Sequence, residues 1–167
     1  MVGSVEIVRA NPASDEVLPL LQEHLVDMYA TSPAESVHAL DPEQLRHPSI
    51  TFFVARDGTE VVGTGAIREL SATEGELKSM RTSAGARGRG VGAAMLEHLL
   101  AEAHTRGYRA LRLETGVEDY FAPARRLYAR YGFVEGEPFA DYWADPNSVF
   151  MHLELEEVRV DQLVIQA

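Results

Sequence analysis

The chain has 167 residues, 46% of them hydrophobic and 25% charged, which is the composition of one ordinary folded domain. Its 26 acidic and 15 basic residues leave a formal net charge of −11, which argues against nucleic acid as a partner because phosphate backbones attract basic surfaces. The absence of cysteine excludes disulfides, thiolate catalysis and cysteine metal sites. We find no signal-like N-terminus and no apolar run of about 18 residues, so we expect a cytoplasmic protein without a membrane partner.

Strand and helix patterns alternate along the N-terminal half. Residues 5–9 are predicted to form a strand, and the turn that follows is predicted to end in Ser14 as a helix N-cap. Apolar residues then recur at helical spacing between 17 and 28. Beyond these elements we expect, in chain order, a polar loop at 31–39, a short helix at 41–46, and strands at 51–55 and 61–67 around the hairpin signal Asp57-Gly58.

The same alternation continues in the C-terminal half. A strand at 75–82 precedes a segment rich in glycine and arginine, from which a helix runs to Gly107. The later elements are predicted to be a strand at 110–115, a helix at 123–131, a strand from 133 and a last strand at 149–155. The pattern predicts a single α/β (α+β) domain over residues 1–167, with its core at about 5–155 and a tail at 156–167 that we do not assign.

The most informative segment is Arg87-Gly88-Arg89-Gly90-Val91-Gly92, which is predicted to open a long helix directly after a strand. Glycine lets the backbone approach a ligand closely. The first turn of a helix carries unpaired N–H groups and partial positive charge, and two guanidinium groups add charge-assisted hydrogen bonds. We expect the apolar stripe of the helix to be buried (Val91, Met95, Leu96, Leu99, Leu100 and Ala103), which would hold this end rigidly. The segment therefore predicts a site for a pyrophosphate.

Two other phosphate-binding motifs, the Walker-type loop and the dinucleotide pattern, are alternative interpretations of this segment. A Walker-type loop needs Lys-Ser/Thr after its last glycine, where this chain has Val91-Gly92, so that motif is absent. The dinucleotide pattern G-x-G-x-x-A fits Gly88, Gly90 and Ala93, and Glu114 ends the next strand where a ribose-binding acid would lie. However, the loop at 83–87 is longer than the tight turn of that motif, so a nicotinamide-dependent oxidoreductase remains only an alternative.

Segment 87–92 resembles the R-x-x-G-x-G acyl-CoA signature of the GNAT superfamily of N-acetyltransferases. Segments 76–82 (ELKSMRT) and 127–133 (LYARYGF) match this superfamily in order and spacing, and the resemblance covers about residues 5–155. Segments 113–116, 138–142 and 145–151 resemble more narrowly the small bacterial acetyltransferases of the YsnE type. One departure is Phe121, where the superfamily often has an asparagine that contacts pantetheine.

The resemblance implies a single-domain GNAT-like fold, with a central mixed β-sheet splayed open after residue 82 and flanked by helices. Acetyl-CoA would be the co-substrate and would lie in the splay, with its pantetheine along the strand and its pyrophosphate on the glycine loop. No metal is implied, and the six histidines show no metal-binding spacing. The cofactor-binding residues implied are Met80, Arg81, Thr82, Arg87, Gly88, Arg89, Gly90, Val91, Gly92 and Ala93.

Two residues are candidates for proton transfer. Tyr128 lies where the superfamily often keeps a tyrosine near the CoA sulfur, so it is the predicted acid for the departing thiolate; the alternative is that it only packs the helix. Glu76 is the predicted base, because strand alternation would put it with Lys78 and Met80 on one face and Leu77, Ser79 and Arg81 on the other. The alternative is a structural pair of Glu76 with Lys78. His38, in the polar loop, is a second candidate base, but the sequence favours the alternative of a solvated loop histidine.

The sequence thus predicts an acyl-CoA-dependent N-acetyltransferase that moves an acetyl group directly to a primary amine of a small polar acceptor. Serine, histidine and carboxylate side chains in loops 31–39 and 139–148 would flank the acceptor, and Arg68 and Lys78 could hold a carboxylate of it. A catalytically weak sensor or regulatory module that binds acyl-CoA is the alternative. The acceptor, the acyl-chain preference and the oligomeric state stay open, and a homodimer remains compatible with the sequence.

Overall fold

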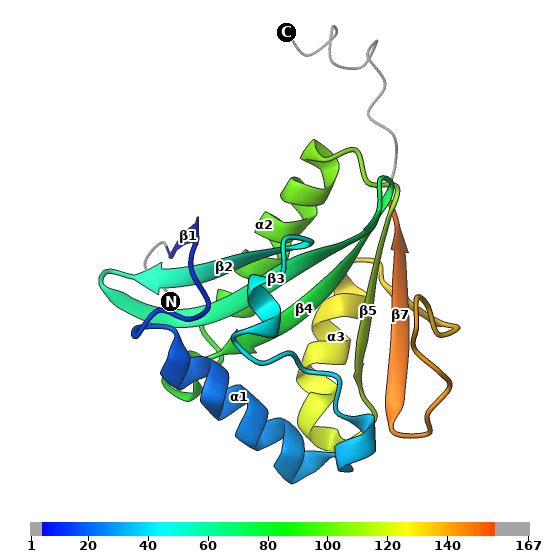
Figure 1. Cartoon of the computed structure of the whole chain (residues 1–167), viewed down its shortest axis with the longest axis horizontal. Coiled ribbons are helices and arrows are strands. Elements are labelled where there is room, and N and C mark those ends of the chain that lie inside the picture. The colour runs from blue at the N-terminus through cyan, green and yellow to red at the C-terminus, as the bar shows by residue number, and fades with distance from the viewer. Residues whose placement is uncertain (1–4, 156–167) are drawn as a thin grey trace, which may run out of the picture.

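The computed structural model describes residues 5–155, so the predicted tail at 156–167 lies outside the described residues. A seven-stranded sheet with the order β1-β2-β3-β4-β5-β7-β6 forms the centre of the molecule (Figure 1). Its strands are β1 (Glu6–Arg9), β2 (Ile50–Asp57), β3 (Glu60–Ser71), β4 (Glu74–Thr82), β5 (Ala110–Gly116), β6 (Val134–Gly136) and β7 (Ser148–Glu154). The α-helices are α1 (Leu18–Thr31), α2 (Val91–Thr105) and α3 (Ala122–Arg130), and the short 3-10 helices are η1 (Ala34–Ser36), η2 (Gln44–Arg46), η3 (Ala84–Ala86) and η4 (Asp119–Phe121).

Helices cover both faces of the sheet (Figure 1). Helix α1 packs on one face, where Val17 and Leu21 contact Val54 and Ala66 of the central strands. Helices α2 and α3 pack on the other face in a larger apolar cluster. The predicted apolar stripe of α2 is confirmed, since its buried residues are Val91, Met95, Leu96, Leu99 and Ala103. This packing fixes the N-terminus of α2 against the sheet, as an anion site requires.

The predicted splay of the sheet is confirmed. Strands β4 and β5 are parallel, and they pair only where Glu74, Gly75 and Glu76 lie beside Ala110, Leu111 and Arg112. Beyond that point β4 continues to Thr82 and β5 to Gly116 with no register between them. The facing backbone edges of the two strands are therefore open to a ligand that can hydrogen-bond to them.

A β-bulge in β4 changes which side chains share a face. Ser79 and Met80 together oppose one residue of β3, and Ser79 has a left-handed φ of 54°. Met80 consequently packs with Leu77 on the α2 side, whereas Arg81 reaches α1 on the side of Glu76. The simple alternation predicted for Met80 and Arg81 is therefore wrong, because the extra residue of a bulge reverses the side-chain order beyond it.

Two helix starts also differ from the sequence-based prediction. Helix α1 begins at Leu18, with Pro19 in its first turn, and Ser14 instead contributes its carbonyl to the preceding turn. Helix α2 begins at Val91 rather than at Gly88, because Gly88 and Gly90 both have positive φ (77° and 83°). A helix cannot run through such residues, which instead turn the chain into it.

Candidate active site

A cavity of about 540 Å³ lies where the sheet splays, between β4, the start of α2 and the segment from η4 to α3. Most of the predicted cofactor-binding residues line it: Met80, Arg81, Thr82, Arg87, Gly88, Gly90, Val91, Gly92 and Ala93. The opposite wall, which sequence reasoning largely missed, consists of Tyr120, Phe121, Pro123, Ala124, Leu127, Tyr128 and Arg130, with His24 and Thr64 from α1 and β3. The cavity therefore joins segments that are more than 30 residues apart in the chain.

The glycine loop has the shape that a phosphate site needs. A Cβ added at Gly88 or Gly90 would have no neighbour within 4 Å, so the space beside both glycines is open. In the first turn of α2, Ala94 donates its N–H to the carbonyl of Gly90, which leaves the N–H groups of the preceding turn without helical acceptors. These groups and the helix dipole make the loop suitable for a pyrophosphate.

The two arginines of the loop lie in different surroundings. Arg87 lines the cavity, is half exposed, and has its guanidinium 3.9 Å from Asp27 of α1. Arg89 does not line the cavity, and its guanidinium pairs with Asp57 at 2.8 Å. The structure thus places only Arg87 of the predicted pair in the cavity wall.

Arg81 lines the cavity, but its guanidinium is bound by other side chains of the protein. The guanidinium pairs with Glu23 (2.5 Å) and Asp27 (2.7 Å) and donates to the Tyr120 hydroxyl at 2.6 Å. Its side chain is only 4% exposed, so these partners compensate a buried charge. Arg81 therefore joins β4 to α1 and to the β5–α3 connection beside the cavity.

Tyr128 lies at the inner wall of the cavity. It is 6% exposed, and its ring contacts Phe133 edge-to-face at 5.8 Å. Burial raises the pKa of its hydroxyl above the ordinary value near 10, so the residue is protonated at neutral pH. Tyr128 thus packs α3 on the sheet and also lines the cavity, so its role as the acid stays a prediction.

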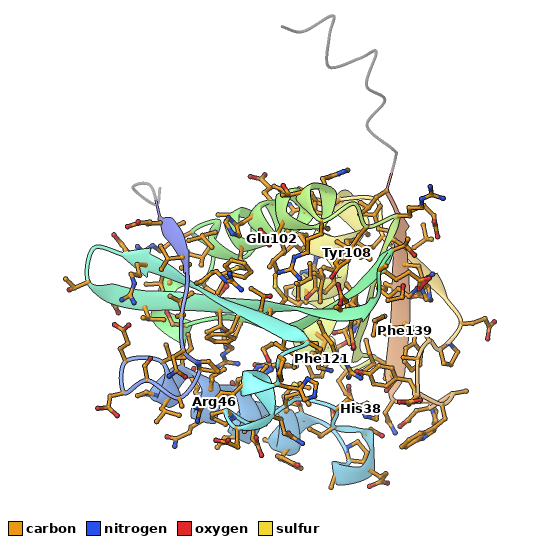
Figure 2. The ribbon with its side chains drawn as sticks, turned by 45° about the horizontal axis from the view of Figure 1, so that its top comes forward. His38, Arg46, Glu102, Tyr108, Phe121 and Phe139 are labelled. Atoms are coloured by element: carbon orange, nitrogen blue, oxygen red, sulfur yellow. The ribbon has the colours of Figure 1, made fainter. Side chains whose placement is uncertain are left out.

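Phe121 occupies the position where the superfamily often has asparagine. It is 7% exposed, lines the cavity and contacts Tyr120 edge-to-face at 4.9 Å. An aromatic ring offers no hydrogen bond to a pantetheine amide, so this wall can contribute only apolar contact. Figure 2 labels Phe121 and also His38, which lies on the α1–β2 connection.

Glu76 lies beside the narrow end of the splay, where β4 last pairs with β5, and it is not part of the cavity wall. It is 1% exposed, and its Oε2 accepts hydrogen bonds from Lys78 (3.3 Å) and from the Tyr142 hydroxyl (2.5 Å). Lys78 also donates to Tyr142 at 2.8 Å. On the other side Arg68 lies 3.8 Å from Oε1. The structural pairing of Glu76 with Lys78, the alternative to a catalytic role, is therefore present.

Glu114 is a titratable residue of this region that the sequence did not single out as a base. It lies on β5 two residues beyond the last pairing with β4 and, like Glu76, is not part of the cavity wall. It accepts one hydrogen bond, from Ser148 at 3.3 Å. Desolvation raises the pKa of its carboxyl from 4.5 to about 7, despite the opposing effect of Lys78. The signal that could have revealed it was a lone acid at an inward position of a central strand.

His38 contacts the aromatic cluster above this region. Its ring lies 5.0 Å from that of Tyr142 and 5.7 Å from that of Trp143, both edge-to-face. Burial, aided by Lys78, lowers its pKa below the ordinary value near 6.5, so the imidazole is neutral at physiological pH. His38 therefore packs against Tyr142, the residue whose hydroxyl donates to Glu76.

Residues 5–155, the described part of the chain, contain neither a cluster of metal ligands nor a membrane-spanning helix. No group of three or more histidine, aspartate or glutamate side chains there is arranged to hold a metal ion. None of the helices in the same range is long and apolar enough to cross a membrane.

Comparison with known proteins agrees with this geometry. Residues 17–133 match the acetyltransferase (GNAT) family. The uncharacterised N-acetyltransferase YsnE of Bacillus subtilis is 52% identical over 84% of this chain and 93% of its own length. An IAA acetyltransferase of Azospirillum brasilense is 42% identical over 91% and 99%.

A solved structure shows the same fold. A GNAT family acetyltransferase from Elizabethkingia anophelis with acetyl-CoA bound has a TM-score of 0.63 at 17% identity, covering 90% of this chain and 98% of that one. The family match sets aside the dinucleotide-dependent alternative. The splayed sheet and the glycine loop agree with these matches, and the chain belongs to the GNAT family of acetyltransferases.

Proposed function

We propose that the protein transfers the acetyl group of acetyl-CoA directly to a primary amine of a small polar acceptor. The observation that supports this most is the composition of one cavity wall. The glycine loop, the unpaired edge of β4 and the buried Tyr128 all line the same space. An anion site, a peptide-like edge and a proton donor are the features that a pyrophosphate, a pantetheine and a leaving thiolate require.

The residues present fit acetyl-CoA. Gly88 and Gly90 leave room for the pyrophosphate, Arg87 adds a charged donor beside it, and the free edge of β4 from Lys78 to Thr82 suits the pantetheine amides. Arg89 can act there only after leaving Asp57. We therefore assign the phosphate contact to the loop backbone and to Arg87 first.

The reaction itself needs two proton transfers. The acceptor nitrogen attacks the thioester carbonyl carbon, so that a C–N bond forms and the C–S bond breaks. The nitrogen loses a proton, and the departing sulfur gains one. We propose that Tyr128 donates the second proton, since its raised pKa keeps it protonated. The same burial also disfavours a free thiolate, which is why an acid is useful at this place.

For the first proton we favour Glu114 over Glu76 and His38. The Glu76 carboxylate is held by Lys78 and Tyr142, and these contacts fix its position. Glu114 has one hydrogen bond and a pKa of about 7, which suits a base that must work near neutral pH. Glu76 then acts as the residue that positions Lys78 and Tyr142 around the acceptor.

The contacts between loops 31–39 and 139–148 favour a small acceptor. Ser36 of η1 donates to Asp145 of the β6–β7 connection at 2.6 Å, and Asn147 donates to Ser36 at 3.4 Å. These contacts join the two loops that were predicted to flank the acceptor. The joined loops carry hydroxyl, amide and carboxylate groups, which suit a small polar amine.

The proposal is tested by release of free thiol from acetyl-CoA with a panel of amines and amino acids, with the acetylated product identified by mass spectrometry. We expect thiol release that depends on the amine. Tight CoA binding with no thiol release from any amine would instead support the alternative of an acyl-CoA sensor.

A further inference from the structure

Arg68 has hydrogen-bonding capacity that the chain does not use. It lies on β3 directly opposite Glu76 of β4, and its side chain is 35% exposed. Among residues 5–155 its only charged partner is Glu76, at 3.8 Å, which is longer than a hydrogen bond. The Oε1 atom of Glu76 that it approaches is buried and has no hydrogen-bond partner there either. A guanidinium carries five N–H donors, so this pair leaves most of them for a ligand.

The charge of Glu76 does not require Arg68. Lys78, whose side chain is 7% exposed, already pairs with Glu76, and Tyr142 hydrogen-bonds to the same carboxylate oxygen. Two cationic side chains therefore face one carboxylate in a partly buried region. Arg68 is thus not needed to neutralise Glu76, and a bound anion can pair with its guanidinium instead.

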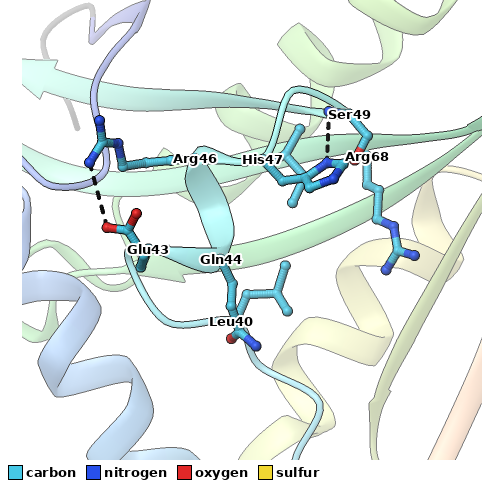
Figure 3. A pocket seen from close by; sticks show the side chains of 8 residues that line it. Leu40, Glu43, Gln44, Arg46, His47, Ser49 and Arg68 are labelled. Atoms are coloured by element: carbon cyan, nitrogen blue, oxygen red, sulfur yellow. Dashed lines mark hydrogen bonds and ion pairs between the residues drawn. The ribbon is translucent and has the colours of Figure 1, made fainter.

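A second cavity, of about 520 Å³, opens beside Arg68 between η2 and the start of β2. Figure 3 shows its wall, with Arg46 joined to Glu43 and His47 joined to Ser49, while the Arg68 guanidinium extends without a contact to the other side chains drawn. Of the basic side chains in this wall, Arg68 is thus the one without a hydrogen bond among the described residues. The cavity gives a polar small molecule a way to the guanidinium.

Arg68 and Glu114 lie on the strands at either side of β4, on the same face of the sheet. The register places Arg68 opposite Glu76, and Glu76 beside Arg112, two residues before Glu114 on β5. Adjacent paired strands lie about 4.8 Å apart, so the backbones of β3 and β5 are separated by about 10 Å here, and by more where the sheet splays. Both side chains lie on the face of the sheet that carries α1, with Glu76 and Lys78 of β4 between them.

We propose that Arg68 binds a carboxylate of the acceptor, so that the amines acetylated are amino acids or close analogues that carry both groups. The guanidinium matches a carboxylate in bidentate geometry, which lysine cannot reproduce. The acceptor amino group then lies toward Glu114 and the open part of the splay. An amine without a carboxylate leaves the Arg68 charge unpaired and binds poorly. This inference rests on the proposed acetyl transfer for its turnover assay, but it also has a test by binding alone.

The experiment compares matched pairs of amines with wild-type protein, Arg68→Gln and Arg68→Lys. Each pair is an amino acid and the amine left by its decarboxylation, such as phenylalanine with phenethylamine or lysine with cadaverine. We expect wild-type kcat/KM to favour the amino acid. Arg68→Gln should lower kcat/KM for the amino acid on the order of 10- to 100-fold per charged hydrogen bond lost, with little change for its partner amine. Arg68→Lys should restore only part of the loss, because lysine keeps the positive charge but cannot form the two parallel hydrogen bonds of a guanidinium.

Arg56→Gln is the matched control, since it removes one arginine from β2 that pairs with the exposed Glu16 and lies outside both cavities. It should leave the preference unchanged. An equal loss on both members of each pair in Arg68→Gln, or a wild-type preference for the decarboxylated amines, would overturn the proposal.

Calorimetric titration of the CoA-loaded protein with the same amino acids separates this inference from the proposed function. Binding that Arg68→Gln abolishes while CoA affinity stays constant supports the carboxylate site even if no acetyl transfer is found. Acetylation of simple amines together with no binding of any amino acid supports the transferase but refutes the role of Arg68.

Discussion

The substitution Glu114→Gln should stabilise the fold and damage the reaction at the same time. Burial raises the carboxyl pKa from 4.5 to about 7, which means that ionising Glu114 in the folded protein costs up to about 3 kcal/mol relative to the unfolded chain. Below pH 4.5 the carboxyl is protonated in both states and this cost is absent. As the pH rises from about 4.5 to about 7, the unfolded chain releases the proton first, so stability falls, and above about pH 7 the full cost applies.

Glutamine has the shape of the neutral acid and never ionises. Glu114→Gln should therefore match the wild type near pH 4 and exceed its unfolding free energy by up to about 3 kcal/mol near pH 8, measured by urea denaturation at both pH values. Without a base, kcat should fall by about 10²- to 10⁴-fold, and the rise of wild-type kcat/KM through an apparent pKa near 7 should disappear.

The control is Glu76→Gln, which should destabilise the protein at both pH values because it leaves the buried Lys78 without its ion pair. If Glu114→Gln were less stable than the wild type near pH 8, the argument from desolvation would be wrong. If it kept wild-type turnover and pH profile, Glu114 would not be the base.

Substitutions at four further positions test three separate parts of the site. Tyr128→Phe keeps the buried ring and should lower kcat by about 10²-fold or more at nearly constant KM for acetyl-CoA, measured by steady-state kinetics; unchanged kcat would remove the hydroxyl from the reaction. Arg87→Ala should raise the KM for acetyl-CoA by about 10-fold or more. Arg89→Ala should change this KM by less than about 3-fold, because the Arg89 side chain pairs with Asp57. Equal effects on KM would contradict the different placement of the two arginines. Thr64→Val removes the hydroxyl that donates to the Ser79 carbonyl at 2.7 Å and should lower the unfolding free energy by about 1–3 kcal/mol, with Thr64→Ser recovering most of it in the same denaturation assay.

The glycine loop and the buried face of α2 were largely predictable from the sequence. Gly88 and Gly90 both have positive φ, and the apolar spacing after Val91 describes the face of α2 that is buried. Both are local properties: glycine at a left-handed position and a 3.6-residue period are written in consecutive residues. The resemblance to the GNAT superfamily rests on the same consecutive segments, which is why family and fold were predicted together.

The faces of β4 were not predictable in the same way. Alternation is a local rule, but the bulge at Ser79 and Met80 depends on how β4 pairs with β3, so it reversed the predicted placement of Met80 and Arg81. The start of α1 was missed for a similar reason. Ser14 has the residue type of an N-cap, yet its carbonyl closes a turn before Leu18.

The family, the position of the glycine loop and the choice of Tyr128 as a candidate acid could all be inferred from the sequence, because each depends on residues close together in the chain. Which charges face one another became apparent from the folded structure. It separated Arg87 from Arg89, held Glu76 between Lys78 and Tyr142, left Arg68 with free donors and raised the pKa of Glu114. The physical reason is that Coulomb energy and desolvation depend on distance and burial in space, and residues from β3, β4, β5 and the β6–β7 connection meet here only after the sheet has formed.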